Sequence, residues 1–238
     1  KNLVKRADGI IAVSEHTKAA LIDVLQVSEH KITVAPLGVD QELFRPHLEI
    51  DQLRHVRNVY GLPGEFMLYV GTMEPRKNLL RIIEAFEQAN TSASLVLAGK
   101  WGWKYSAIIK RIEQSPKKSM IKYLGYIPAA DKPYLMKLAR VFVWPSLYEG
   151  FGLPPLEAMA VGTPVLTSNV TSLPEVVGDA ALMVNPYNVK DIASAMELLC
   201  KSETVRDHYI AKGIERARNF TWDKTAAQLE EVINELRK

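Results

Sequence analysis

Residues 141–158 read VFVWPSLYEGFGLPPLEA, and this stretch decides the fold. Its first four residues are apolar and β-branched or aromatic, which is typical of a buried strand. The two glycines that follow let the backbone approach a ligand closely, and the adjacent prolines suit the first turn of a helix. A strand, a ligand-binding loop and a helix in this order form the repeating unit of α/β proteins.

Apolar runs of the same kind recur along the chain and alternate with amphipathic segments of helical period. The runs cover residues 10–13, 32–35, 66–70, 94–98, 121–124, 141–144, 165–168 and 181–184. This alternation predicts an α/β fold: a Rossmann-like parallel sheet with helices on both faces. In open sheets of this type the loops after the strands carry the ligand site.

We expect three parts in the chain. Residues 1–40 form a strand, helix, strand unit that ends another domain or a linker, because prolines and a glycine interrupt the following stretch. Residues 41–220 form the Rossmann-like domain, and residues 221–238 form a closing helix with Thr221 as its N-cap. The predicted apolar face of this helix comprises Trp222, Thr225, Leu229, Ile233 and Leu236.

Composition excludes several classes of protein. The chain has 238 residues, with 30 basic and 27 acidic residues spread evenly, which argues against nucleic acid as a partner. Its single cysteine, Cys200, excludes an internal disulfide and a multi-cysteine zinc site, and favours a reducing compartment. No apolar run approaches the ~18 residues that span a bilayer. We expect a cytoplasmic protein, with peripheral attachment at the inner face of the membrane left open.

The loop at residues 71–78 reads GTMEPRKN and precedes a helix that we expect to begin at Leu79. Arg76 and Lys77 place two cations beside a helix N-terminus, where backbone N–H groups and the helix dipole also attract anions. An Arg fork and a Lys point charge suit a diphosphate. The alternative is that both are ordinary solvated residues at the start of a helix.

The second loop carries Glu149, and Glu157 follows about one turn into the next helix. Two carboxylates on either side of a glycine-rich turn can accept hydrogen bonds from the hydroxyls of a sugar and of a ribose. The backbone amides of Phe151, Gly152 and Leu153 could meet phosphate or sugar oxygens. Taken alone, the two glutamates could equally be surface carboxylates.

Together the two loops resemble those of the retaining glycosyltransferases of GT-B architecture, the group 1 glycosyl transferases with a Glu-x7-Glu pair. The likeness extends through AMAVGTPV at residues 158–165 and covers nearly the whole chain. It implies a C-terminal, donor-binding domain. The segment ADGIIAVSEHTK at 7–18 resembles the end of the acceptor domain, and the last helix resembles one that crosses back to that domain.

The resemblance also implies roles for particular residues. Lys77 and Arg76 would neutralise the diphosphate leaving group, Glu149 would bind the hexose near its 3-hydroxyl, and Glu157 would bind the ribose hydroxyls. The other residues expected to line the donor site are Gly71, Thr72, Lys100, Tyr126, Ile127, Phe151, Gly152 and Leu153.

Some of these assignments have open alternatives. The segment around Tyr126 could be an ordinary turn with that ring capping the core, and Lys100 could simply be solvated. Many family members have Gly-Arg where this chain has Gly71 and Thr72, so one diphosphate cation comes from Arg76 or is absent. The GTMEPRKN version resembles that of a mannosyltransferase subgroup, which makes GDP-mannose the favoured donor.

We therefore expect a retaining hexosyltransferase of polysaccharide biosynthesis that moves mannose from a nucleoside-diphosphate sugar to an acceptor. No Asp-x-Asp pair is present, so no metal and no cofactor is expected. The chain begins without Met, and we expect a segment of a longer enzyme, inactive alone, whose saccharide or lipid-linked acceptor binds the missing N-terminal domain. The alternatives are a non-catalytic sugar-nucleotide subunit and another nucleotide-sugar enzyme, such as an epimerase or a phosphorylase. No oligomeric state is predicted.

Overall fold

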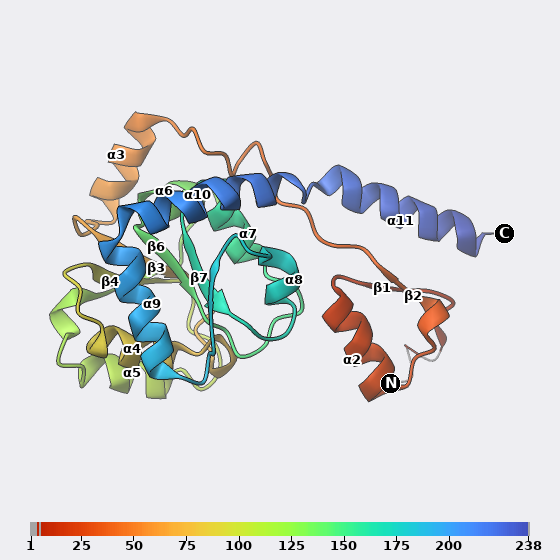
Figure 1. The fold of residues 1–238 in the computed structure, drawn as a ribbon, viewed down its shortest axis with the longest axis horizontal. Coiled ribbons are helices and arrows are strands. Elements are labelled where there is room, and N and C mark those ends of the chain that lie inside the picture. Colours follow the sequence, from red (N-terminus) through yellow and green to blue (C-terminus); the bar gives the residue numbers. More distant parts are fainter. Residues whose placement is uncertain (1–3, 5, 238) are drawn as a thin grey trace.

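The computed structural model describes residue 4 and residues 6–237, and the strands in this part of the chain form two parallel sheets. The larger sheet has six strands in the order β5-β4-β3-β6-β7-β8 (Figure 1). These strands are β3 (Phe66–Val70), β4 (Ser94–Ala98), β5 (Ile121–Gly125), β6 (Val141–Trp144), β7 (Val165–Ser168) and β8 (Leu182–Val184). The predicted Rossmann-like sheet is confirmed, and each predicted run matches its strand to within one residue.

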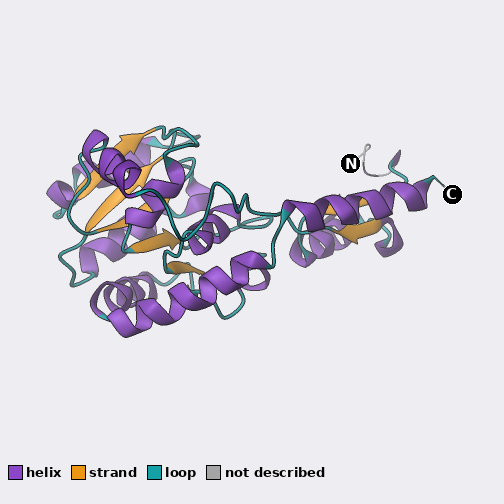
Figure 2. Ribbon diagram, turned by 90° about the horizontal axis from the view of Figure 1, so that it is seen from above, coloured by secondary structure: helices purple, strands orange, loops and turns teal. Residues whose placement is uncertain are grey.

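Helices cover both sides of this sheet (Figure 2). Helix α4 packs against α5 and α9 in one group, and α7 packs with α6, α8 and α10 in another, while α3 contacts α6. Their bounds are α3 (Ile50–Val59), α4 (Leu79–Gln88), α5 (Ser106–Glu113), α6 (Lys132–Leu138), α7 (Leu153–Ala160), α8 (Leu173–Val177), α9 (Val189–Lys201) and α10 (Glu203–Arg218). Helix α4 begins at Leu79, as predicted.

The core lies around the two central strands, β3 and β6, whose residues are all buried. Strands covered on both faces are apolar throughout rather than alternating, which is why 66–70 and 141–144 read as continuous apolar runs. Trp144 stacks on Tyr69 with ring centroids 5.0 Å apart, and it is 1% exposed. Burying a large side chain of this kind stabilises the fold by roughly 2–3 kcal/mol.

A small unit precedes the large sheet and lies to one side of it (Figure 1). It consists of β1 (Ile10–Ala12), α2 (Glu15–Leu25), the 3₁₀ turn η1 (Glu29–Lys31) and β2 (Ile32–Val34). It has a separate core of Ala12, Val27 and Ile32. The division of the chain at residue 40 stays a prediction.

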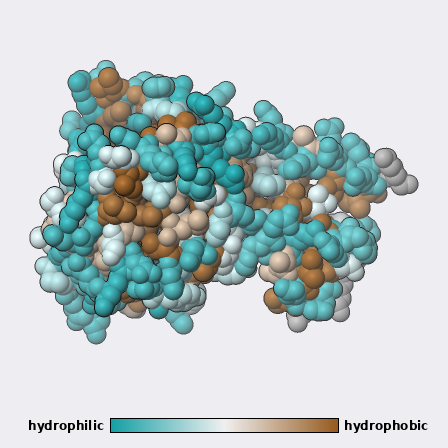
Figure 3. Space-filling model, in the orientation of Figure 1, coloured by the Kyte–Doolittle hydropathy of each residue, from teal (hydrophilic) through white to brown (hydrophobic). Residues whose placement is uncertain are grey.

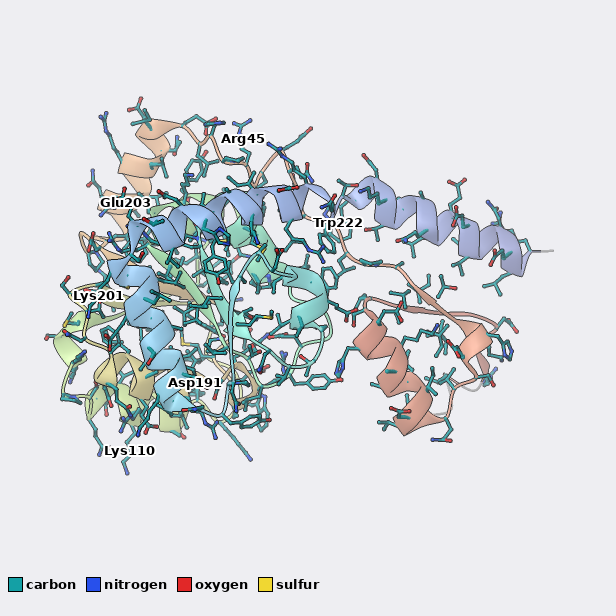
Figure 4. All side chains as sticks on the ribbon, in the orientation of Figure 1. Arg45, Lys110, Asp191, Lys201, Glu203 and Trp222 are labelled. Carbon is teal, nitrogen blue, oxygen red and sulfur yellow. The ribbon has the colours of Figure 1, made fainter. Side chains whose placement is uncertain are left out.

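Helix α11 (Trp222–Leu236) leaves the large domain and extends along the small unit (Figure 2). Trp222 lies where α10 gives way to α11 (Figure 4). Gly38 packs against this junction so closely that a Cβ there would lie 2.2 Å from the backbone nitrogen of Trp222. The Thr225 hydroxyl donates to the Pro36 carbonyl at 2.7 Å, which joins the helix to the segment between β2 and α3.

The predicted N-cap of α11 is confirmed, and the predicted apolar face stays a prediction. The Thr221 hydroxyl accepts a hydrogen bond from the backbone of Lys224. The buried positions are Thr225 and Val232, two turns apart, whereas Trp222, Ile233 and Leu236 are each about half exposed. Leu236 nevertheless lies against the small unit, since a Cβ at Gly9 would be 2.9 Å from its Cδ1.

The described helices include none that is both long and apolar enough to cross a membrane. Apolar side chains do appear on one face of the large domain, beside α9 (Figure 3). They line a shallow hollow of about 410 Å³ between β8 and α9, with Leu182, Met183 and Leu198 among its walls.

Candidate functional site

The order of the strands places both sequence-predicted loops at one point. Strands β4 and β5 lie on one side of β3, and β6 lies on the other, so the direction in which the chain adds strands to this parallel sheet switches between β3 and β6. Ligands of open α/β sheets bind at such a switch point, outside the carboxyl ends of the strands. The loops after β3 and β6 meet there, and the backbone N–H of Leu147 donates to the carbonyl of Arg76 at 2.9 Å.

The loop after β3 ends in a 3₁₀ turn, η2 (Pro75–Lys77), which the sequence analysis did not predict. Asn78 follows in the left-handed conformation, with φ of 65°, and α4 starts after it. The Asn78 side chain donates to the carbonyls of Pro145 and Pro186, at 2.9 and 2.7 Å. It therefore fixes this loop against the segments that follow β6 and β8.

The two cations of this loop point at the first glutamate. Lys77 Nζ lies 2.6 Å from Oε1 of Glu149, and Nη1 of Arg76 lies 2.8 Å from Oε2. Arg76 also pairs with Glu74 at 2.8 Å, and the buried hydroxyl of Ser146 donates to Glu149 Oε1 at 2.6 Å. Two cations and two carboxylates make a cluster with no net charge.

Burial distinguishes the two cations. Lys77 is 9% exposed, and its Nζ lies 4.5 Å from the centre of the Trp144 ring. Burial lowers the pKa of Lys77, and the charge of Glu149 only partly opposes this shift. Burial acts in the same direction on Arg76, but the charges and hydrogen bonds of Glu149 and Glu74 outweigh it and raise the pKa of the guanidinium.

The second predicted glutamate has a different partner. Glu157, on α7, pairs with Lys132 at the start of α6. Its side chain is 14% exposed, and Lys132 Nζ also lies 5.6 Å from the centre of the Phe44 ring. The structure therefore places Glu149 and Glu157 in separate ion pairs, one on each side of the glycine-rich loop.

Two glycines let the ends of β3 and β4 approach each other. Gly99 has φ of 132°, and a Cβ there would lie 2.0 Å from the carbonyl oxygen of Gly71. A Cβ at Gly71 would lie 2.7 Å from the ring of Trp144. The carbonyl of the neighbouring Thr72 accepts a hydrogen bond from the Tyr69 hydroxyl at 2.9 Å. Gly71 and Thr72 thus form the floor of the site through their backbone.

The other predicted site residues divide into exposed and buried groups. Lys100 Nζ lies 4.8 Å from the centre of the Tyr126 ring, and that ring is 63% exposed, so it does not cap the core. Ile127 is buried in the core. The Phe151 ring is buried against Phe220, which leaves only the backbone of Phe151 for a ligand.

Two further predicted residues are backbone features of the same turn. Gly152 has φ of 132°, a conformation that favours glycine, and it precedes the first residue of α7, Leu153. Among the described residues, the backbone N–H groups of Gly152 and Leu153 have no hydrogen-bond acceptor. They are therefore available to a ligand, and their binding to one stays a prediction.

Several residues of the site were missed from sequence. Ser146 contacts Glu149 directly, and Ser172 donates to the carbonyls of Glu149 and Phe151, at 2.9 and 2.7 Å. The Pro-Ser pair before Glu149 was a local signal for the contact made by Ser146. Nothing near Ser172 in sequence indicates a contact with a loop more than 20 residues away.

The described residues contain no group of three His, Cys, Asp or Glu side chains that could hold a metal ion. A hollow of about 510 Å³ lies away from the cluster around Glu149, between residues 42–52 and α6. Its walls include Arg45, Glu49, Asp131 and Tyr134. This hollow includes none of the sequence-predicted site residues.

Comparison with known families and proteins agrees with this architecture. Residues 56–216 match the model described as "Glycosyl transferases group 1", and residues 1–43 match "Glycosyltransferase Family 4". The chain is 37% identical over 224 residues to the "O-antigen chain mannosyltransferase B" of Escherichia coli, covering 92% of this chain and 58% of that protein. It is 33% identical over 228 residues to the "Serotype-specific mannosyltransferase WbdA" of the same species, covering 93% and 28%.

A solved structure shares the fold. The glycosyltransferase from Rickettsia africae superimposes with a TM-score of 0.88 at 19% identity, over 97% of this chain and 64% of that one. The chain thus spans less than two thirds of the length of each of these three proteins.

Proposed function

Because this chain belongs to the group 1 glycosyl transferases, we propose that it is the donor-binding part of a retaining hexosyltransferase that uses GDP-mannose. Both relatives described above are named as mannosyltransferases, which supports mannose as the sugar. The observation that carries the proposal is the convergence of Arg76, Lys77 and Glu149 at the switch point of the sheet. A polysaccharide acceptor is in keeping with the name of the first relative.

In the proposed complex the donor diphosphate lies against the loop at residues 71–78. Lys77 and Arg76 are then the groups that meet its oxygens, and the free N–H groups of Gly152 and Leu153 are further donors for the ligand. Because the cations are already paired with Glu149 and Glu74, the diphosphate must replace these carboxylates as their partner. Glu149 is then released to accept hydrogen bonds from hydroxyls of the hexose.

The reaction proposed is transfer on one face of the sugar. The acceptor oxygen bonds to the anomeric carbon on the face that the diphosphate leaves. The bond from that carbon to the phosphate oxygen breaks, and its electron pair stays on the phosphate, which takes the proton of the acceptor hydroxyl. Negative charge grows on the leaving oxygens, so removing one donor such as Lys77 should cost about 3 kcal/mol of transition-state stabilisation.

The remaining parts of the donor are assigned by position. Glu157 accepts hydrogen bonds from the ribose hydroxyls, in competition with Lys132. The nucleobase lies near the backbone of Tyr126 and Ile127, with Lys100 beside it. Side-chain cations rather than a divalent metal neutralise the diphosphate. The saccharide or lipid-linked acceptor binds the N-terminal domain of the complete enzyme. We propose that this enzyme is cytoplasmic and does not bind nucleic acid.

Calorimetric titration of the chain with GDP, UDP and ADP, with and without Mg²⁺, tests the proposal. We expect GDP to bind most tightly and equally well in both conditions, and both Lys77→Ala and Glu157→Ala to weaken it. Lys110, which points away from the domain (Figure 4), provides the control variant Lys110→Ala, which should bind as the wild type does. Failure of all three nucleotides to bind, or wild-type affinity in both site variants, would refute the assignment.

A further inference from the structure

The first turn of α2, in the small unit, lies against the loop that carries Glu149. The hydroxyls of Ser14 and Thr17 both donate to the carbonyl of Gly150, at 2.7 and 3.0 Å. The ring of His16 makes an edge contact with that of Tyr148, with centroids 5.4 Å apart. These contacts fall on the residues immediately before and after Glu149, although α2 is more than 130 positions away in the chain.

A carboxylate of the large domain holds α2 in this place. The backbone N–H groups of Glu15 and His16 donate to the two oxygens of Glu175, at 2.9 and 3.2 Å. The N–H of Thr17 donates to the Ser14 hydroxyl, which is the N-cap. A helix N-terminus attracts a negative charge and needs acceptors for its first N–H groups, so Glu175 satisfies both requirements.

The backbone of Glu149 itself is held from the other side. Its N–H donates to the Thr171 hydroxyl at 3.2 Å, and its carbonyl accepts from Ser172 at 2.9 Å. The next peptide group has only the contacts of its carbonyl with Ser14 and Thr17, because the N–H of Phe151 has no acceptor among the described residues. Glycine has wide conformational freedom, so the peptide after Gly150 depends on these two hydroxyls for its orientation.

We propose that Ser14 and Thr17 are positioning residues that hold the Glu149 carboxyl in the direction required for the hexose of the donor. They act through the Gly150 carbonyl and do not touch the substrate. The inference rests on the proposed function, in which Glu149 binds the sugar. It also makes the geometry of the donor site depend on where the small unit lies, since any displacement of α2 would break both hydrogen bonds.

The test compares the affinity of GDP-mannose with that of GDP for the same protein. The difference between the two affinities measures the contacts of the hexose. The affinity of GDP alone measures the contacts of the nucleoside and the diphosphate. In the wild type we expect GDP-mannose to bind about tenfold more tightly, the value of one charge-assisted hydrogen bond. In the double variant Ser14→Ala/Thr17→Val we expect this advantage to disappear while the affinity for GDP changes by less than about twofold.

Two control proteins separate positioning from folding. Ser14→Thr/Thr17→Ser keeps both hydroxyls and should retain the advantage of GDP-mannose. Ser202→Ala removes an N-cap of the same kind from α10, where the hydroxyl accepts from the backbone of Val205, and should leave both affinities unchanged. Circular dichroism of each variant checks that the fold is intact.

The outcomes are distinguishable. Retention of the GDP-mannose advantage in the double variant would overturn the positioning role while leaving the proposed function intact. An equal loss of affinity for both ligands would also overturn it, because the defect would then lie in the whole site. If the wild type binds GDP without any advantage for GDP-mannose, the assignment of Glu149 to the hexose is wrong and this inference is wrong with it.

Discussion

Lys77 and Glu149 are 72 positions apart in the chain, yet Nζ of the lysine lies 2.6 Å from Oε1 of the glutamate in a place where both side chains are about 90% buried. Taking two charges out of water is costly, and their attraction repays this cost only when further hydrogen bonds satisfy the remaining polar atoms. Ser146 and Arg76 supply such bonds here. In the absence of a ligand, Glu149 therefore pairs with Lys77 and holds its ammonium group where an anionic ligand would bind.

The first prediction concerns this competition. Glu149→Gln removes the charge that holds Lys77 and Arg76, so GDP should bind about tenfold more tightly, or ~1.4 kcal/mol. Sugar transfer by the complete enzyme should fall at the same time, because an amide is a weaker acceptor for hexose hydroxyls. Calorimetry with GDP measures the first effect. The control Glu197→Gln alters a partly exposed carboxylate that pairs with Lys201 outside the site, and it should leave GDP binding unchanged. Weaker GDP binding by Glu149→Gln would argue against the competition.

The second prediction concerns pH. Protonated Lys77 attracts the diphosphate, and burial lowers the pKa of this lysine in the free protein. Affinity for GDP should therefore fall as pH rises, starting below the range in which ordinary lysines titrate. Within that window binding should take up protons, which calorimetry in buffers of different ionisation enthalpy detects. In Lys77→Arg, whose guanidinium stays charged, both the fall in affinity and the proton uptake should vanish.

A third prediction tests the role of Glu157. If this carboxylate binds the ribose, the wild type should prefer GDP over 2′-deoxy-GDP by about tenfold, the value of a hydrogen bond to a charged group. Glu157→Gln should reduce this preference without altering the ratio between GDP and GDP-mannose. An unchanged preference in the variant would place the ribose elsewhere. Lys132→Met should strengthen GDP binding if the lysine competes for the same oxygens.

A fourth prediction concerns the floor of the site. Gly99→Ala should destabilise the fold by at least about 3 kcal/mol, because the new Cβ would meet the Gly71 carbonyl and the φ of 132° is strained for alanine. Urea unfolding measures this change. Gly64→Ala is the matched control, since a Cβ there meets nothing within 4 Å. Similar midpoints for the two variants would mean that the close approach of β3 and β4 is relaxed in solution.

Local signals were sufficient to predict much of the fold. Continuous apolar runs between glycines and prolines located the eight strands of the described residues, because buried parallel strands need such runs and their loops need such breakers. The N-cap at Thr221 and the start of α4 at Leu79 were also predicted, because both depend on residues that are neighbours in the sequence. The burial of Val232 on α11 was not predicted, since apolar spacing does not say which residues a neighbour covers.

The candidate site was predicted as two loops, but not as a set of contacts. Motif and charge pointed to Arg76, Lys77, Glu149 and Glu157. The sequence did not indicate that the first three form one neutral cluster with Glu74, that Glu157 pairs with Lys132, or that Ser172 and α2 hold the glycine-rich loop.

The sequence by itself determined the α/β class, the positions of the strands and the two loops, since hydrophobic period and turn chemistry are expressed within about ten neighbouring residues. Only the tertiary structure decided which charges neutralise one another and which hydroxyls hold Glu149. Those contacts depend on the pairing of β3 with β6 and on the docking of α2 beside α8. Both arise when segments distant in the chain bury their surfaces together, so no local pattern records them.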